Sequence, residues 1–175
     1  QVTPESSCDS VVMLWSGERL LVASCAAGPA FEGGEISHGV RAASGAIDHV
    51  SLVDGDLHLS TIDGAAPNGI CGSGIFDMVA TLLDAGAADT SGRMVDDQAA
   101  QELSPAIAKR LRGEGPAREF VVVPGAQAAD GTDIVFTQKD LREVQLAKGA
   151  VRAAVELLCA EAGMAADQIE EVLLA

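Results

Sequence analysis

The residues best suited to bind a ligand lie in a glycine-rich segment at residues 24–45, S-C-A-A-G-P-A-F-E-G-G-E-I-S-H-G-V-R-A-A-S-G. Glycine reaches positive φ without steric cost and lets a ligand or a second backbone come close. Glu32, Glu35 and His38 place polar side chains among the glycines. The segment has neither the Gly-Lys-Ser/Thr of a Walker loop nor the Gly-x-Gly-x-x-Gly of a Rossmann fold. Two interpretations stay open: a structural loop packed on its own sheet, and a loop that lines a nucleotide or anion pocket.

A second motif of small residues, Gly72-Ser73-Gly74, precedes an apolar run with helical spacing. That run predicts a helix that ends near Gly86 and has its apolar positions at Ile75, Met78, Val79, Leu82 and Leu83. We expect Ser73 to cap this helix and Asp77 to lie in its first turn, where the helix dipole favours a carboxylate. The free N–H groups at this end could hold a phosphate. Tight packing of the helix on a sheet explains the glycines equally well.

A third candidate, Lys148, lies in the longest predicted helix. Thr137 and Asp140 approximate a capping box at its start. Lys148 continues an apolar stripe made of Leu141, Val144, Val151, Val155 and Leu158. The neighbouring Gly149 costs about 1 kcal/mol relative to alanine inside a helix. Either an anionic group approaches this turn, or Lys148 extends from the edge of the stripe to water.

The remaining reactive side chains predict no metal site. The four cysteines are far apart and form no C-x-x-C pair: Cys8, Cys25, Cys71 and Cys159. We expect them to be free thiols that behave as small buried hydrophobic groups. Asp96 and Asp97 could bind a metal, although a solvated loop is the stronger interpretation.

Short strands and turns must position these motifs. Alternating apolar residues predict three hairpins, formed by Val11–Trp15 with Arg19–Ser24, His49–Val53 with Leu57–Ile62, and Phe120–Val123 with Asp133–Phe136. Asp54-Gly55-Asp56 supplies the turn of the second hairpin. A short helix is expected around Ala106–Leu111 and a last strand at Ile169–Ala175.

Composition narrows the classes of function. The 175 residues are 48% hydrophobic, which favours a folded domain over disorder. The formal net charge of −15 disfavours binding to nucleic acids and to anionic membranes. We find neither a signal peptide nor a run of 18 apolar residues, so we expect a cytoplasmic protein.

Four segments then show a family resemblance. They are S-C-A-A-G-P-A-F-E-G-G-E-I, G-A-I, G-I-C-G-S-G-I-F-D and F-T-Q-K-D-L-R-E-V-Q-L-A-K-G-A-V. In this order they closely resemble the ATPase region of reductive activators of corrinoid proteins, over about residues 10–175. Those activators are ferredoxin-linked members of the superfamily of sugar kinases, heat-shock chaperones and actin.

The resemblance implies an α/β fold, the C-terminal ribonuclease-H-like half of that superfamily's ATPase, with a mixed sheet flanked by helices. It implies ATP and Mg as cofactors and a corrinoid protein of a methyltransferase system as partner. The activator reduces Co(II) corrinoid to Co(I), and a 2Fe-2S ferredoxin domain absent from this chain delivers the electron. The residues expected to face the nucleotide are Gly28, Glu32, Gly33 and Gly34, then Gly72, Ser73 and Gly74, and then Lys148. Glu32 or Glu35 could hold a metal-bound water, and no catalytic residue is assigned.

The chain also departs from the family pattern. Glu5-Ser6-Ser7-Cys8-Asp9 stands where the family has an Asp-x-Gly-Thr-Asn phosphate loop, and the family continues beyond the equivalent of Ala175 into an adenosine loop. We therefore expect a single domain that is an incomplete half of an ATPase, with a mismatched segment at 1–9 and a variable insertion at 87–135, inactive alone as an ATPase. A docking module for a corrinoid protein that hydrolyses nothing is the alternative function. A small-molecule kinase lacks a substrate-binding motif here, and a homodimer stays open.

Overall fold

The computed structural model describes residues 10–173, which divide into two units: residues 29–145, and residues 10–28 together with 146–173. A mixed three-stranded sheet, in the order β4-β3-β5, lies at the centre of the 29–145 unit. Its strands are β3 (Ala46–Val53), β4 (Asp56–Thr61) and β5 (Gly69–Ile70). β3 runs antiparallel to β4 and parallel to β5. Asp54 and Gly55 both have positive φ, 51° and 79°, as the tight turn between β3 and β4 requires.

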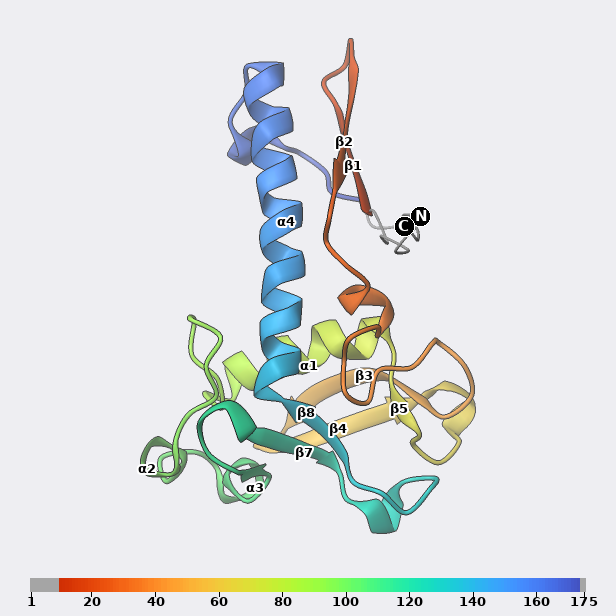
Figure 1. The fold of residues 1–175 in the computed structure, drawn as a ribbon, viewed down its shortest axis with the longest axis vertical. Coiled ribbons are helices and arrows are strands. Elements are labelled where there is room, and N and C mark those ends of the chain that lie inside the picture. The colour runs from red at the N-terminus through yellow and green to blue at the C-terminus, as the bar shows by residue number, and fades with distance from the viewer. Residues whose placement is uncertain (1–9, 174–175) are drawn as a thin grey trace, which may run out of the picture. The chain divides into compact units, whose positions relative to one another are not determined.

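Helix α1 (Gly72–Asp84) packs on this sheet through its apolar stripe (Figure 1). Ile75, Met78 and Leu82 are fully buried, and the Thr81 hydroxyl donates to the Val50 carbonyl of β3 at 3.4 Å. Gly86, at φ 69°, follows the last residues of the helix, as the sequence predicts. The spacing of apolar residues therefore places α1 correctly.

The second sheet of the same unit is antiparallel, in the order β6-β7-β8. Its strands are β6 (Leu111–Arg112), β7 (Glu119–Val123) and β8 (Ile134–Thr137). Phe120 and Phe136 face each other across β7 and β8 and are fully buried. The short helices α2 (Asp97–Ala100) and α3 (Pro105–Ala108) precede this sheet in the chain.

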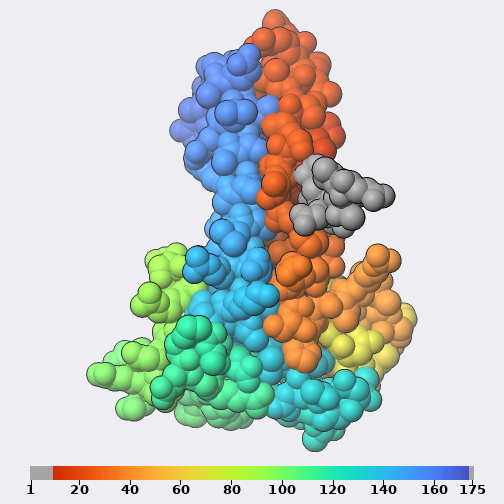
Figure 2. All heavy atoms as spheres, in the orientation of Figure 1, coloured from red at the N-terminus to blue at the C-terminus, as the bar shows by residue number. Residues whose placement is uncertain are grey.

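The other unit consists of a hairpin, the later turns of the longest helix, and the segment that follows them. The hairpin pairs β1 (Ser10–Trp15) with β2 (Leu20–Cys25). Helix α4 (Gln138–Ala162) begins in the 29–145 unit and continues into this one. Figure 2 shows the hairpin alongside the last turns of α4, where the Arg19 guanidinium donates to the Glu161 carbonyl at 3.5 Å.

Several local predictions are wrong. Helix α1 starts at Gly72 with Cys71 as its N-cap, so Ser73 is not the cap and Asp77 lies in the second turn. The helix expected around Ala106–Leu111 ends at Ala108, because Leu111 instead pairs with Phe120 in the β6–β7 ladder. No strand forms over residues 169–173, where the backbone finds no neighbouring strand to pair with.

Three cysteines, Cys25, Cys71 and Cys159, are free and buried as expected. Cys8 and the expected mismatch at residues 1–9 lie outside the described residues, as do residues 174 and 175. Among the helices described between residues 10 and 173, none combines the length and the apolar character needed to cross a lipid bilayer.

Candidate functional site

The glycine-rich segment folds back on itself immediately after Gly28. A short 3-10 helix, Ala30–Glu32, is closed by Gly33 at φ 85°. The N–H of Gly33 donates to the Ala30 carbonyl at 3.2 Å, and that of Gly34 donates to the Pro29 carbonyl at 2.8 Å. Glu35 has φ 60°, which is uncommon for a residue with a side chain. The loop therefore holds one left-handed glutamate directly beside the Gly-Gly pair.

Close approach of the loop to its own backbone explains several of its glycines. A Cβ on Gly39 would collide with the carbonyl of Gly33, and one on Gly34 would lie 2.6 Å from the Pro29 ring. A Cβ on Gly33 would lie 3.0 Å from the Val40 nitrogen. These contacts support the interpretation of a loop packed on itself. They do not test whether the outer rim of the loop also faces a nucleotide.

Asp140 fixes this loop to the start of α4. Its side chain is fully buried, and one carboxylate oxygen accepts hydrogen bonds from the Ser37 N–H at 2.8 Å and the Ser37 hydroxyl at 3.0 Å. The other oxygen accepts from the Thr137 N–H at 2.8 Å, while the Asp140 N–H donates to the Thr137 hydroxyl at 3.0 Å. The predicted capping box is therefore confirmed, and its carboxylate also holds the loop.

The N-terminus of α1 lies directly against the same loop. A Cβ on Gly72 would collide with the Phe31 carbonyl, and one on Gly74 would collide with the Ile47 carbonyl of β3. The rings of Phe31 and Phe76 stack with their centroids 4.8 Å apart. The structure thus brings together two motifs that are separate in the sequence, Glu32–Gly34 and Gly72–Gly74.

Exposed polar groups surround this junction. Ser73, Glu32 and Glu35 are exposed, and the first turn of the 13-residue helix α1 carries N–H groups at the positive end of the helix dipole. Such an arrangement can bind an anion, and an exposed carboxylate beside it can hold a hydrated cation. Within residues 10–173 no three His, Cys, Asp or Glu side chains gather closely enough to hold a metal ion by themselves.

Gly28 and Lys148 belong to the other unit. Gly28 has φ 67° with open space around it, so its backbone conformation, rather than a close contact, accounts for the glycine. Lys148 is exposed, and the buried side of α4 continues instead through Ala147 and Ala154. A Cβ on Gly149 would meet no atom within 4 Å. The role of Lys148 in binding an anion stays a prediction.

Sequence reasoning missed three contributors to this region. Ser37 anchors the loop to Asp140, and Phe31 and Phe76 cover the junction. The chain has only four phenylalanines, and these two lie within or beside the two glycine motifs. The position of Phe31 and Phe76 next to the glycine motifs was the one feature of the sequence that could have pointed to their contact.

Comparison with known proteins gives consistent matches. A family profile described as the C-terminal domain of RACo, the ASKHA domain, matches residues 9–175. The corrinoid activation enzyme RamQ of Eubacterium limosum is 36% identical over 158 residues, which are 90% of this chain and 26% of RamQ. The [Co(II) methylated amine-specific corrinoid protein] reductase of Methanosarcina barkeri is 31% identical over 161 residues, 88% of this chain and 27% of that protein.

A solved structure supports the fold. The reductive activator for corrinoid, iron-sulfur protein superposes with a TM-score of 0.81 at 34% identity, over 94% of this chain and 25% of that one. The chain therefore spans about a quarter of the length of the relatives it matches. The α/β fold expected from the sequence is confirmed.

Proposed function

Because this chain belongs to the family of C-terminal ASKHA domains of RACo, we propose that it is the nucleotide-binding part of a protein that reductively activates corrinoid proteins. The observation that best supports the proposal is that the relatives of this chain share one described role. Two relatives and one solved structure, at 31 to 36% identity, are all named for corrinoid activation or reduction.

The proposal assigns ATP to the junction of the glycine-rich loop and the start of α1. Ser73 and the N–H groups of Gly72 and Gly74 would hold a phosphate, and Glu32 or Glu35 would hold a water of the accompanying Mg. The residues fit these roles because Ser73 and the two carboxylates are exposed. Gly28 and Lys148 are further candidate contacts. Bound ATP would supply the free energy that favours one conformation of the whole protein.

The chain's own contribution would be to couple the bound nucleotide to its surroundings. Ser37 and Asp140 join the loop to the start of α4, so a change in the loop is transmitted to the longest helix. A ligand shifts a conformational equilibrium only by its difference in affinity for the two states. Such a shift can favour the corrinoid-protein state in which Co(II) is easier to reduce. We place this activity in the cytoplasm, with the electron coming from a 2Fe-2S domain and the product serving a methyltransferase system.

Calorimetric titration of Mg-ATP into the full-length parent protein tests this proposal. A variant of Gly33 would not test nucleotide contact by itself. Its positive φ and the closeness of Val40 mean that a side chain there is expected to disrupt the loop. Glu32→Gln and Ser73→Ala change exposed side chains instead. Each is expected to weaken ATP binding by about tenfold, since each removes one polar contact to a charged ligand. Glu102→Gln, another exposed glutamate of the same unit, is the control. Unchanged affinity in both variants would remove the site assignment.

The docking alternative is supported by one surface. Five large apolar side chains of the β1–β2 hairpin are each more than half exposed: Val11, Met13, Trp15, Leu20 and Val22. Exposed apolar patches of this kind often bind other proteins. A pull-down of the corrinoid protein with and without ATP separates the two functions, because binding that is independent of nucleotide favours docking.

A further inference from the structure

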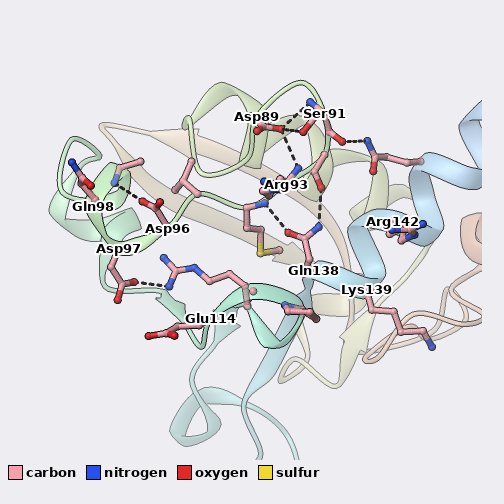
Figure 3. A pocket seen from close by; sticks show the side chains of 18 residues that line it. Asp89, Ser91, Arg93, Asp96, Asp97, Gln98, Glu114, Gln138, Lys139 and Arg142 are labelled. Atoms are coloured by element: carbon pink, nitrogen blue, oxygen red, sulfur yellow. Dashed lines mark hydrogen bonds and ion pairs between the residues drawn. The ribbon is translucent and has the colours of Figure 1, made fainter.

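A groove lies in the 29–145 unit, and Figure 3 shows the side chains that line it. Its volume is about 1130 Å³, and most of residues 89–99 and 114–118 line it together with the first turns of α4. None of the residues expected to face the nucleotide lines it. The groove falls largely within the segment that the sequence suggests is a variable insertion.

Arg118 in the groove wall is buried with part of its guanidinium unpaired. The residue is 3% exposed. Its Nη1 donates to the Asp97 carboxylate and, at 2.7 Å, to the Gly113 carbonyl. Its Nε and Nη2 are shielded from solvent and have no hydrogen-bond partner among the described residues. A buried donor without an acceptor costs about 1–3 kcal/mol, and more when it is charged. Two donors of a buried charged group are therefore left without an acceptor from residues 10–173.

The unpaired atoms lie on one edge of the guanidinium. The N–H groups of Nε and Nη2 point in the same direction and form the fork that receives two oxygens of a carboxylate or phosphate group. Asp97 and Gly113 bond only to Nη1. The free edge is therefore complete and matches a bidentate oxyanion.

The charges around the groove are balanced in number, because four carboxylates, those of Asp89, Asp96, Asp97 and Glu114, line it together with four basic side chains. Four of the eleven lysines and arginines of this acidic chain line it: Arg93, Arg118, Lys139 and Arg142. Among residues 10–173, Arg93, Lys139 and Arg142 form no ion pair. Figure 3 shows Asp96, Asp97 and Glu114 at the opposite end from Lys139 and Arg142. Those carboxylates repel a polyanion such as a nucleoside triphosphate more strongly than a mono- or dianion, because the repulsion grows with the charge of the ligand.

We propose that this groove binds a small mono- or dianion through a carboxylate or phosphate group held on the Nε–Nη2 edge of Arg118. Arg118 fixes the orientation of the anion, and the positive charges of Arg93, Lys139 and Arg142 along the groove offset the carboxylates at the end where Arg118 pairs with Asp97. Because the Nε–Nη2 edge is shielded from solvent, side chains of the wall must move before an anion reaches it, and Gln98 and Glu114 are exposed side chains of that wall. From the sequence, Asp96 and Asp97 could be metal ligands or part of a solvated loop. In the structure Asp96 caps α2 and Asp97 orients Arg118.

The test is a titration of the chain with inorganic phosphate and, separately, with acetate, followed by the NMR signal of the Arg118 Nε–H. This proton is buried and therefore protected from exchange with water. Both anions, or one of them, are expected to shift it in a saturable way, and the stronger ligand identifies the chemistry as phosphate or carboxylate. Arg118→Lys keeps the charge but removes the fork, so backbone amide shifts should show about tenfold weaker binding.

Two further variants keep the proposal testable if Arg118→Lys does not fold. Glu114→Gln removes an exposed negative charge and is expected to strengthen binding about threefold, and Arg142→Gln is expected to weaken it about threefold. Arg152→Lys, an exposed arginine paired with Glu156 outside the groove, is the control. If neither anion moves the Arg118 Nε–H, or if only exposed amides shift, the groove holds water and the proposal is overturned.

Discussion

Asp140 shows how much one side chain organises in this chain. Its carboxylate receives three hydrogen bonds, two of them from Ser37, which lies 103 positions earlier in the sequence. If the Asp140 carboxylate were replaced, the three donors would lose their acceptor or face another donor. The glycine-rich loop and the start of α4 therefore depend on a single buried residue.

We expect Asp140→Asn to destabilise the protein by about 2–3 kcal/mol, because the amide replaces one acceptor oxygen with a donor that faces N–H groups. Urea unfolding measures the loss, and faster hydrogen exchange at the Ser37 amide locates it. Glu143→Gln, a substitution on the same helix, should change neither measurement appreciably. An Asn variant as stable as the parent would show that the loop is held by its glycine contacts alone.

At the scale of elements, local sequence patterns predicted most helices and hairpins correctly. They did not predict contacts between residues far apart in the sequence. The three hairpins, α1 and the Thr137–Asp140 cap follow from alternation, helical spacing and capping rules. Ser73 failed as a cap because Cys71 already lies in an extended conformation at the end of β5. Leu111 is not part of the predicted helix because it pairs with Phe120 in the β6–β7 ladder.

The candidate site was harder to predict than the fold. The two glycine motifs could be read from the sequence, but their contact through Phe31 and Gly72 could not. The pairing of Arg118 with Asp97 joins residues 21 positions apart, with α3 and β6 between them. No periodicity encodes such contacts, since they depend on how the second sheet folds.

The β6–β7–β8 sheet carries an acid-sensitive contact. Asp133 accepts a hydrogen bond from the Gly125 N–H at 2.6 Å and pairs with Arg112 at 2.7 Å. The Gly125 N–H, followed by Arg112, lowers the pKa of Asp133 below its ordinary value of 3.8. Because the folded state favours the ionised form, this stabilisation is complete above the ordinary pKa and is lost as the pH falls through the lowered one.

Asp133→Asn should therefore reduce stability at neutral pH, and the difference from the parent should shrink as the pH falls below about 3.8. Thermal unfolding across an acidic pH series measures this difference. Asp84→Asn, at an exposed aspartate near the end of α1, is the comparison and should not reproduce the trend. A constant difference at every pH would mean that the contact is not ionic.

For the molecule as a whole, a highly acidic chain with one apolar hairpin face suggests how a partner could bind. The formal charge is −15, yet Val11, Met13, Trp15, Leu20 and Val22 lie on one exposed face of β1 and β2. Repulsion between two acidic copies of the chain opposes self-association, while burial of the apolar face favours binding of a partner with a complementary surface. Trp15 is the only tryptophan of the chain, so its fluorescence reports on this face alone.

If the hairpin docks a corrinoid protein, adding the corrinoid-free apoprotein should shift the Trp15 emission to shorter wavelength and reduce quenching by acrylamide. The apoprotein avoids energy transfer from Trp15 to the corrin ring. Met13→Lys places a charge on the face and should weaken binding about tenfold, because a buried interface disfavours an unpaired ammonium group. Leu173→Lys alters an exposed apolar residue outside the hairpin and should leave binding unchanged. An emission spectrum that does not respond to the partner would exclude docking through this face and leave the nucleotide-binding role as the function to pursue.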